Sequence, residues 1–149
     1  MKKLVVFCLS FMAMTTFAQS NSEDVLRRAE VMPVFQDCQE ERLADAPFPC
    51  TMKQLADYFR NAITVENPIG NDTKCVISLV VETDGSVSDV KMPRGVFVNV
   101  EDPEAKAQLQ DSLNAKVLAL AQKLQFKSPG YQDGEKVRVL IQFSAGFKY

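Results

Sequence analysis

Residues 74–95, KCVISLVVETDGSVSDVKMPRG, constrain the fold more than any other stretch of the chain. Two runs rich in β-branched residues flank Asp84 and Gly85, and an Asp-Gly pair between alternating hydrophobic residues is the strongest short-range signal for a β-hairpin. A two-residue turn at this pair places Val81 opposite Ser88. One face of the ribbon is then apolar and the other mixed, so the apolar face needs helices or a third strand against it.

Two other segments have the spacing of amphipathic helices. The first begins at Thr51, which can cap it, and ends before Pro68. Its apolar side chains recur every three or four positions at Met52, Leu55, Phe59 and Ile63. The second covers about residues 103–124 and opens with acids and a proline, which suit a first helical turn. Its apolar stripe consists of Leu109, Leu113, Val117, Leu120 and Leu124.

Residues 136–143 alternate between apolar and polar side chains, which predicts a last β-strand. The order helix, strand, strand, helix, strand predicts an α+β domain over residues 50–149. We expect a three-stranded antiparallel sheet with both helices packed on one face. Residues 19–49 are polar, contain three prolines and show no sustained period, so we expect an irregular N-terminal arm.

Residues 1–18 have the pattern of a signal peptide. Lys2 and Lys3 precede an apolar run, which ends at small residues before Gln19. The run is shorter than the roughly 20 residues that a spanning helix needs. We therefore expect cleavage and export to the periplasm, or secretion beyond it, with no membrane span in the mature chain. An uncleaved N-terminal anchor is the alternative.

Three cysteines remain after cleavage: Cys38, Cys50 and Cys75. In an oxidising compartment this number suggests one disulfide and one leftover thiol. A bridge between Cys38 and Cys50 would close a short loop and stabilise the fold by about 3 kcal/mol. A bridge between Cys50 and Cys75 is the alternative. Cys75 falls on the apolar face of the predicted hairpin, which favours a buried, inert thiol.

The chain contains no histidine, which excludes Ser–His and Cys–His nucleophiles and histidine metal sites. Phosphate-binding glycine motifs and nucleophile elbows are absent from the sequence. Acids cluster near the predicted turn at Glu82, Asp84 and Asp89, but they lack calcium-loop spacing and fit a solvated hairpin tip. The chain is slightly acidic, with a net charge of −2, and has no basic patch for nucleic acid. We expect a binding protein rather than an enzyme, with no catalytic residue, metal or cofactor.

Three motifs, in this order, resemble the TonB C-terminal domain as it occurs in exported proteins of Bacteroidetes. The first is PVF at residues 33–35 with Cys38 and Cys50, similar to a prelude of that family. The second is VETDGSVSDV at residues 81–90, similar to its hairpin V-x-x-D-G-x-V-x-x-V. The third is FKSPG at residues 126–130 followed by DGEKVRV at residues 133–139, similar to its entry into the last strand.

The chain also departs from this family. It has VENP at residues 65–68, where a Tyr-Pro pair is usual, and Thr73-Lys74 where a glycine usually precedes the first strand. Full energy transducers carry a membrane helix with a histidine and a long proline-rich spacer. This sequence has no histidine and no such spacer, so the resemblance implies a free-standing domain that docks on partners.

The resemblance covers residues 33–149 and implies a role for the last strand. In the family, this strand accepts an extended segment of an outer-membrane receptor by β-strand addition. Another envelope protein or a second copy of the chain could fill the same place. The residues to which the resemblance points are Arg138, Val139, Leu140, Ile141, Gln142 and Phe143.

A second hypothesis belongs to a different functional class. It is a small exported enzyme or thiol-active protein that uses Cys75 or an exposed Cys38. This hypothesis predicts a lowered thiol pKa and fast alkylation of the native protein.

Overall fold

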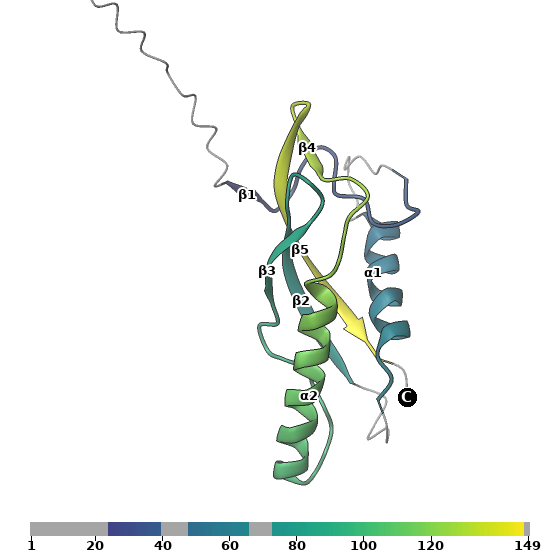
Figure 1. The fold of residues 1–149 in the computed structure, drawn as a ribbon, viewed down its shortest axis with the longest axis vertical. Coiled ribbons are helices and arrows are strands. Elements are labelled where there is room, and N and C mark those ends of the chain that lie inside the picture. Colours follow the sequence, from purple (N-terminus) through teal and green to yellow (C-terminus); the bar gives the residue numbers. More distant parts are fainter. Residues whose placement is uncertain (1–23, 40–47, 66–72, 148–149) are drawn as a thin grey trace, which may run out of the picture.

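The computed structural model describes residues 24–39, 48–65 and 73–147. Within them the chain folds into two α-helices beside one β-sheet (Figure 1), which confirms the predicted α+β class. The elements, in chain order, are β1 Val25–Leu26, α1 Pro49–Ala62, β2 Lys74–Val81, β3 Val87–Lys91, α2 Pro103–Ala121, β4 Gly130–Gln132 and β5 Glu135–Gly146.

The strand order corrects the predicted sheet. β5 lies between β1 and β2 in the order β1-β5-β2-β3, and β4 forms a second hairpin with the beginning of β5. β1 runs parallel to β5, whereas β2 runs antiparallel to both of its neighbours. The prediction of a three-stranded antiparallel sheet in the order helix, strand, strand, helix, strand is therefore wrong, because the described sheet is mixed and five-stranded. β1 and β4 contain two and three residues, too few for an alternating pattern to show in the sequence.

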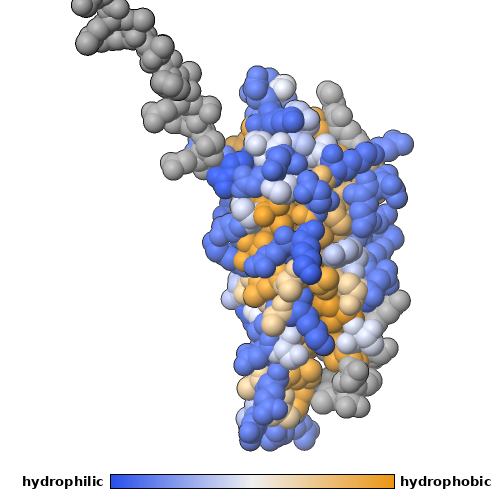
Figure 2. All heavy atoms as spheres, viewed as in Figure 1, coloured by the Kyte–Doolittle hydropathy of each residue, from blue (hydrophilic) through white to orange (hydrophobic). Residues whose placement is uncertain are grey.

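β2 and β5 supply the central layer of the hydrophobic core. In their register Ile77 pairs with Phe143, and both side chains are buried. α1 and α2 place apolar residues such as Phe59 and Val117 in the same buried cluster, so both helices pack on this face of the sheet. Gln142, which alternates with these core residues, is exposed on the other face. On the face shown in Figure 2, hydrophobic residues gather along the middle, with hydrophilic residues around them.

The predicted hairpin between β2 and β3 forms, but its loop is one residue longer than expected. Glu82 closes the loop with Ser86, whose carbonyl oxygen accepts the Glu82 N–H at 2.8 Å. Gly85 has a φ of +82°, which is typical of a three-residue loop that ends in a left-handed glycine. Val81 consequently pairs with Val87, one residue before its predicted partner.

A bulge at Asp89 compensates for this shift. A shift of one residue along the whole strand would turn Asp89 and Lys91 toward the core. Asp89 instead takes a φ of 48°, and the ladder changes register opposite the stretch between Ser78 and Val80. Beyond the bulge Ser78 pairs with Lys91, as predicted, and Val90 packs against the core.

The two helices begin in different ways. Asp102 caps α2, because its carboxylate accepts a hydrogen bond of 2.8 Å from the N–H of Ala105. α1 begins at Pro49, so Thr51 lies inside the helix, and the prediction that it caps α1 is wrong.

Thr51 instead connects α1 to the N-terminal arm. Its buried hydroxyl accepts a hydrogen bond from the N–H of Phe35 at 3.2 Å and donates one to the carbonyl oxygen of Pro33 at 3.5 Å. The arm also pairs with the segment before β5, where Val31 and Tyr131 exchange hydrogen bonds of 3.0 and 2.9 Å. The described part of the arm is therefore built into the fold through contacts with β5, β4 and α1.

Candidate functional site

β5 carries the six residues predicted to receive a partner strand, and their surroundings differ. Arg138 and Val139 pair with Val25 and Leu26 of β1. Residues 140–146 continue past the end of β1, and no strand of the described residues pairs with them on that side. β5 is thus not an edge strand along its whole length. Its second half has one side on which none of the described strands pairs, and we call this side the free edge of β5 (residues 140–146).

Main-chain groups along β5 alternate between the β2 side and the free edge. Phe147 donates its N–H to the carbonyl oxygen of Thr73 at 3.3 Å, one step beyond the paired residues Lys74 and Gly146. Antiparallel pairs alternate between hydrogen-bonded and non-hydrogen-bonded positions. The residues that direct N–H and C=O toward β2 are therefore Ile141, Phe143 and Ala145. Those that direct both groups to the free edge are Gln142, Ser144 and Gly146.

A groove of about 210 Å³ lies beside the beginning of this edge. Residues 140–142 of β5 form one wall. The other walls come from the arm and the start of α1, through Arg27, Met32, Phe48 and Met52. The sequence gives no signal for these four residues as a group, because only the packing of the arm brings them next to β5.

The side chain of Arg138 is bound within the chain. Its Nε lies 2.8 Å from Oε2 of Glu82, and its second guanidinium nitrogen lies 2.9 Å from Oε1. The hydroxyl of Ser88 donates to the same carboxylate. These hydrogen bonds, above all the one from Arg138, lower the pKa of Glu82. Arg138 thus ties β5 to the loop that precedes β3.

The other acids near the hairpin loop also have partners in the chain. The carboxylate of Asp84 accepts a hydrogen bond of 2.9 Å from the N–H of Ser86, and Asp89 forms an ion pair of 2.7 Å with Lys91. Within the described residues, no group of three or more histidine, cysteine, aspartate or glutamate side chains is placed to hold a metal ion.

The cysteines are arranged as favoured from the sequence. Cys38 and Cys50 form a disulfide, which confirms this pairing over the alternative between Cys50 and Cys75. Cys75 is a free, buried thiol on the core face of β2. Burial raises its pKa to about 11, because a thiolate loses its hydration in the protein interior.

No helix in the described part of the chain combines the length and the apolar character needed to cross a membrane. Comparison with known proteins gave no match: no protein-family model, no curated protein and no solved structure matches this chain.

Proposed function

We propose that this protein is an exported binding module that acts in the manner of a TonB C-terminal domain. It would take an extended segment of an outer-membrane receptor, or of another envelope protein, along the free edge of β5. The observation that carries this proposal is the row of main-chain groups at Gln142, Ser144 and Gly146, which face a side without a described strand. Unpaired N–H and C=O groups along a strand are a template for the addition of another strand.

β1 already binds β5 in this way within the chain. Val25 and Leu26 lie parallel to Arg138 and Val139 and end where the free edge begins. A partner strand at residues 140–146 would continue the same ladder. The docking surface is therefore displaced by two residues from the one that the resemblance implied, because β1 covers Arg138 and Val139.

The groove supplies a means of selection. Side chains of an added strand alternate between the two faces of the sheet. Those on the helix-covered face would meet Met32, Phe48 and Met52 at the beginning of the free edge. This lining favours a partner segment with apolar side chains at alternate positions.

The cellular location is part of the proposal. Disulfides persist in oxidising compartments such as the periplasm and the extracellular space, and the pair Cys38 and Cys50 suits them. Together with the signal-like residues 1–18, it supports export to the periplasm or secretion. The module would then hold its partner without transducing energy through a membrane anchor of its own.

A proline substitution at Gln142 tests the proposal. Proline removes the main-chain donor on the free edge, and this N–H does not belong to the ladder with β2. The probes are synthetic peptides that cover extended segments of outer-membrane receptors, titrated by calorimetry. We expect Gln142→Pro to weaken peptide binding at least about tenfold, whereas the control Gln142→Ala, which keeps the N–H, binds as the unmodified chain does.

Circular dichroism and thermal unfolding establish that both Gln142 variants are folded. Equal peptide affinity of the two folded variants would refute strand addition at this edge. Failure of every receptor segment to bind the unmodified chain would refute the receptor class as partner.

The thiol hypothesis gains no support from the cysteine environments. Cys38 is consumed in the disulfide, and Cys75 is buried with a pKa of about 11. At neutral pH roughly one Cys75 thiol in ten thousand would be ionised, and the thiolate is the reactive form.

A further inference from the structure

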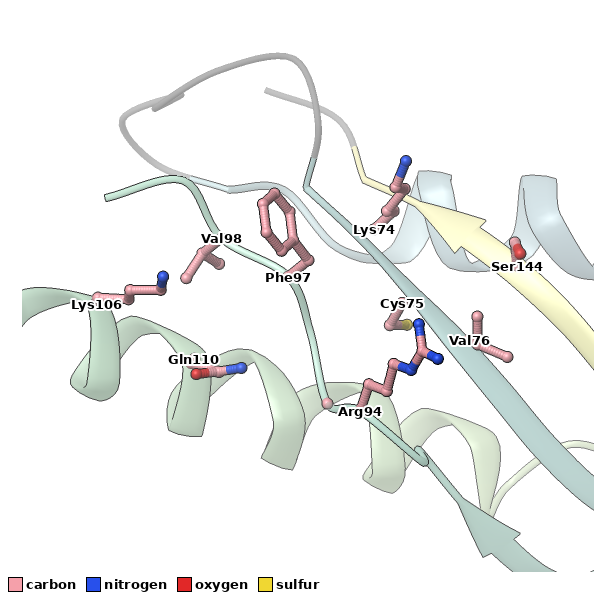
Figure 3. Close-up of a pocket in the computed structure, with 10 residues that line it drawn as sticks. Lys74, Cys75, Val76, Arg94, Phe97, Val98, Lys106, Gln110 and Ser144 are labelled. Atoms are coloured by element: carbon pink, nitrogen blue, oxygen red, sulfur yellow. The ribbon is translucent and has the colours of Figure 1, made fainter. Parts of the chain in front are cut away.

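A second cavity, of about 560 Å³, lies at the beginning of β2, and Ser144 of the neighbouring β5 also lines it (Figure 3). It opens between the beginning of β2, the segment at residues 94–98 and the first half of α2. Its volume lies within the range of roughly 300–1,000 Å³ that is usual for small-molecule sites. We call it the β2–α2 pocket.

The pocket exists because the chain leaves the sheet and returns to it. After Lys91, residues 92–95 turn away from β2, with Gly95 donating its N–H to the carbonyl oxygen of Met92 at 3.3 Å and taking a φ of +65°. The chain rejoins at Phe97, whose N–H donates to the carbonyl oxygen of Lys74 at 2.8 Å. The edge of β2 between these points is left without a strand among the described residues.

α2 holds this detour in place. Asn114 accepts the N–H of Val96 at 2.7 Å through Oδ1, and Gln110 donates to the carbonyl oxygen of Val96 at 2.8 Å through Nε2. Both main-chain groups of Val96 are thus satisfied by side chains of one helix. The opening is therefore built into the fold and does not need a ligand to form it.

Among the residues that the structure describes, three cations and no carboxylate line the β2–α2 pocket. The cations are Lys74, Arg94 and Lys106, which come from three different elements. Figure 3 shows Arg94 extending from its loop toward the part of β2 that carries Cys75. None of the three forms an ion pair with another described residue. This concentration of positive charge is unusual for a chain with a net charge of −2, and it favours an anionic ligand.

The rest of the lining is largely apolar. Val98 and Cys75 are buried at its base. Phe97, at its rim, is 51% exposed and is the one large hydrophobic residue so exposed in the described part of the chain. An exposed aromatic ring beside cations that have no ion-pair partner among the described residues suits a ligand with an apolar body next to its charge.

We propose that the β2–α2 pocket binds a small amphipathic carboxylate, such as a medium-chain fatty acid. Arg94, Lys74 and Lys106 would hold the carboxylate, and Phe97 and Val98 would contact the hydrocarbon chain. Arginine suits this role because its planar fork matches a carboxylate in two hydrogen bonds. Ser144 of β5 also lines the pocket, but the three cations come from β2, the segment at residues 94–98 and α2. The binding of a carboxylate by these cations is therefore tested independently of partner docking.

Dodecanoate, used below its micellar concentration, is the probe. It is titrated into the full chain while the methyl signals of Val76 and Val98, which line the pocket, are followed by NMR. We expect saturable shifts centred on these methyl groups. Acetate, which has the charge without the chain, and methyl dodecanoate, which has the chain without the charge, should each bind at least about tenfold more weakly. Added salt should weaken dodecanoate binding, because it screens exposed charges.

Matched charge substitutions locate the carboxylate. Arg94→Gln and Lys106→Gln should each weaken dodecanoate binding, Arg94→Gln by roughly tenfold. Lys116→Gln, on an exposed position of the same helix as Lys106 and outside the pocket lining, is the control and should leave the affinity unchanged. All three side chains are on the surface or half-buried, so the variants should fold, as thermal unfolding will show.

Three results would overturn the proposal. The first is a titration in which no methyl signal of the pocket moves. The second is binding of the methyl ester as tightly as dodecanoate, which would show nonspecific hydrophobic association. The third is an equal affinity of Arg94→Gln, Lys106→Gln and Lys116→Gln, which would place the ligand elsewhere.

Discussion

Arg138 on β5 donates two hydrogen bonds, of 2.8 and 2.9 Å, from its guanidinium group to the carboxylate of Glu82, the residue just after β2. The ion pair follows directly on the main-chain pair of Val81 and Val139, so side chains continue the β2–β5 contact where the ladder ends. The side chains of Arg138 and Glu82 are 27% and 25% exposed, which limits the screening of the pair by solvent. The ion pair therefore joins the central strand to the loop that leads into β3.

We expect Glu82 to make the stability of the fold depend on pH. The hydrogen bond from Arg138, with a smaller one from Ser88, lowers the pKa of Glu82 in the folded chain below its ordinary value of 4.5. A lowered folded-state pKa contributes stability above the unfolded pKa, and this contribution is lost as the pH falls through the folded value. Glu82→Gln should lower the free energy of unfolding by about 1–2 kcal/mol at pH 7 and by less at pH 3, as measured by urea unfolding.

Glu135→Gln is the control for this substitution. Glu135 lies on β5, the strand that carries Arg138, and is exposed, so its replacement should change the free energy of unfolding by less than about 0.5 kcal/mol. A loss for Glu82→Gln that is the same at pH 7 and pH 3 would contradict a contribution from the charged pair.

Amide hydrogen exchange should alternate along the second half of β5. Ile141 and Phe143 direct their N–H groups to β2, whereas Gln142 and Ser144 direct theirs to the free edge. We expect slow exchange at the first two and fast exchange at the last two in the monomeric chain. Exchange followed by NMR checks this. Slow exchange at Gln142 and Ser144 that disappears on dilution would show that a second copy of the chain covers the edge.

The sequence predicts the parts of this fold that depend on local spacing. The helical spacing of apolar residues predicts a helix over residues 103–124, and the observed α2 covers Pro103–Ala121. The pair Asp84-Gly85 correctly predicts the position of the hairpin loop. The same dipeptide suits loops of two and three residues, so the register near Val81 was wrong by one. The position of β5 between β1 and β2 depends on contacts between segments that are distant in the sequence. The alternation of apolar and polar residues predicts a strand but not its neighbours in the sheet.

The candidate sites were harder to predict for the same reason. The family resemblance points to Gln142 as part of the last strand, but which side its N–H faces follows only from the register with β2. Lys74, Arg94 and Lys106 are far apart in the sequence and come together through the detour at residues 92–97. No pattern in the sequence marks them, because lysine and arginine on a surface are ordinary.

Thr51→Val should weaken the attachment of the arm to α1. The substitution keeps the shape of the side chain but leaves the buried N–H of Phe35 without the acceptor that now lies 3.2 Å away. An unsatisfied buried donor costs about 1–3 kcal/mol, so the free energy of unfolding should fall by this amount. Thr51→Ser retains the hydroxyl and should lose less than half as much. Equal losses would show that the methyl group of Thr51, and not its hydrogen bond, matters.

Thiol titration tests both the disulfide between Cys38 and Cys50 and the burial of the free thiol of Cys75. In a Cys8→Ser chain without reductant, we expect no rapid alkylation of the native protein, because Cys75 is buried and its pKa is raised to about 11. One thiol per chain should react after unfolding in guanidinium. Fast reaction of one thiol in the native protein would revive the thiol-active hypothesis. Two or three reactive thiols after unfolding would contradict the disulfide between Cys38 and Cys50.

Gly85 and Gly134 have nearly the same φ angle but different surroundings. Alanine substitutions at the two positions therefore distinguish the cost of backbone strain from the cost of a steric clash. Their φ angles are +82° and +79°. A Cβ at Gly85 would lie 2.6 Å from the carbonyl oxygen of Phe126, whereas a Cβ at Gly134 would have no heavy atom within 4 Å. Gly134→Ala should therefore cost only the strain of a left-handed alanine, about 1 kcal/mol.

Gly85→Ala should destabilise the chain by about 3 kcal/mol or more, because the collision with a main-chain atom adds to the same strain. The clash would also disturb the hydrogen bond of 2.8 Å from the N–H of Phe126 to the carbonyl oxygen of Gly85. This hydrogen bond holds the hairpin loop against the segment after α2. Urea unfolding of both variants gives the difference. Equal losses would mean that this segment moves aside without cost, and the hairpin loop would then not be fixed by its contact with Phe126.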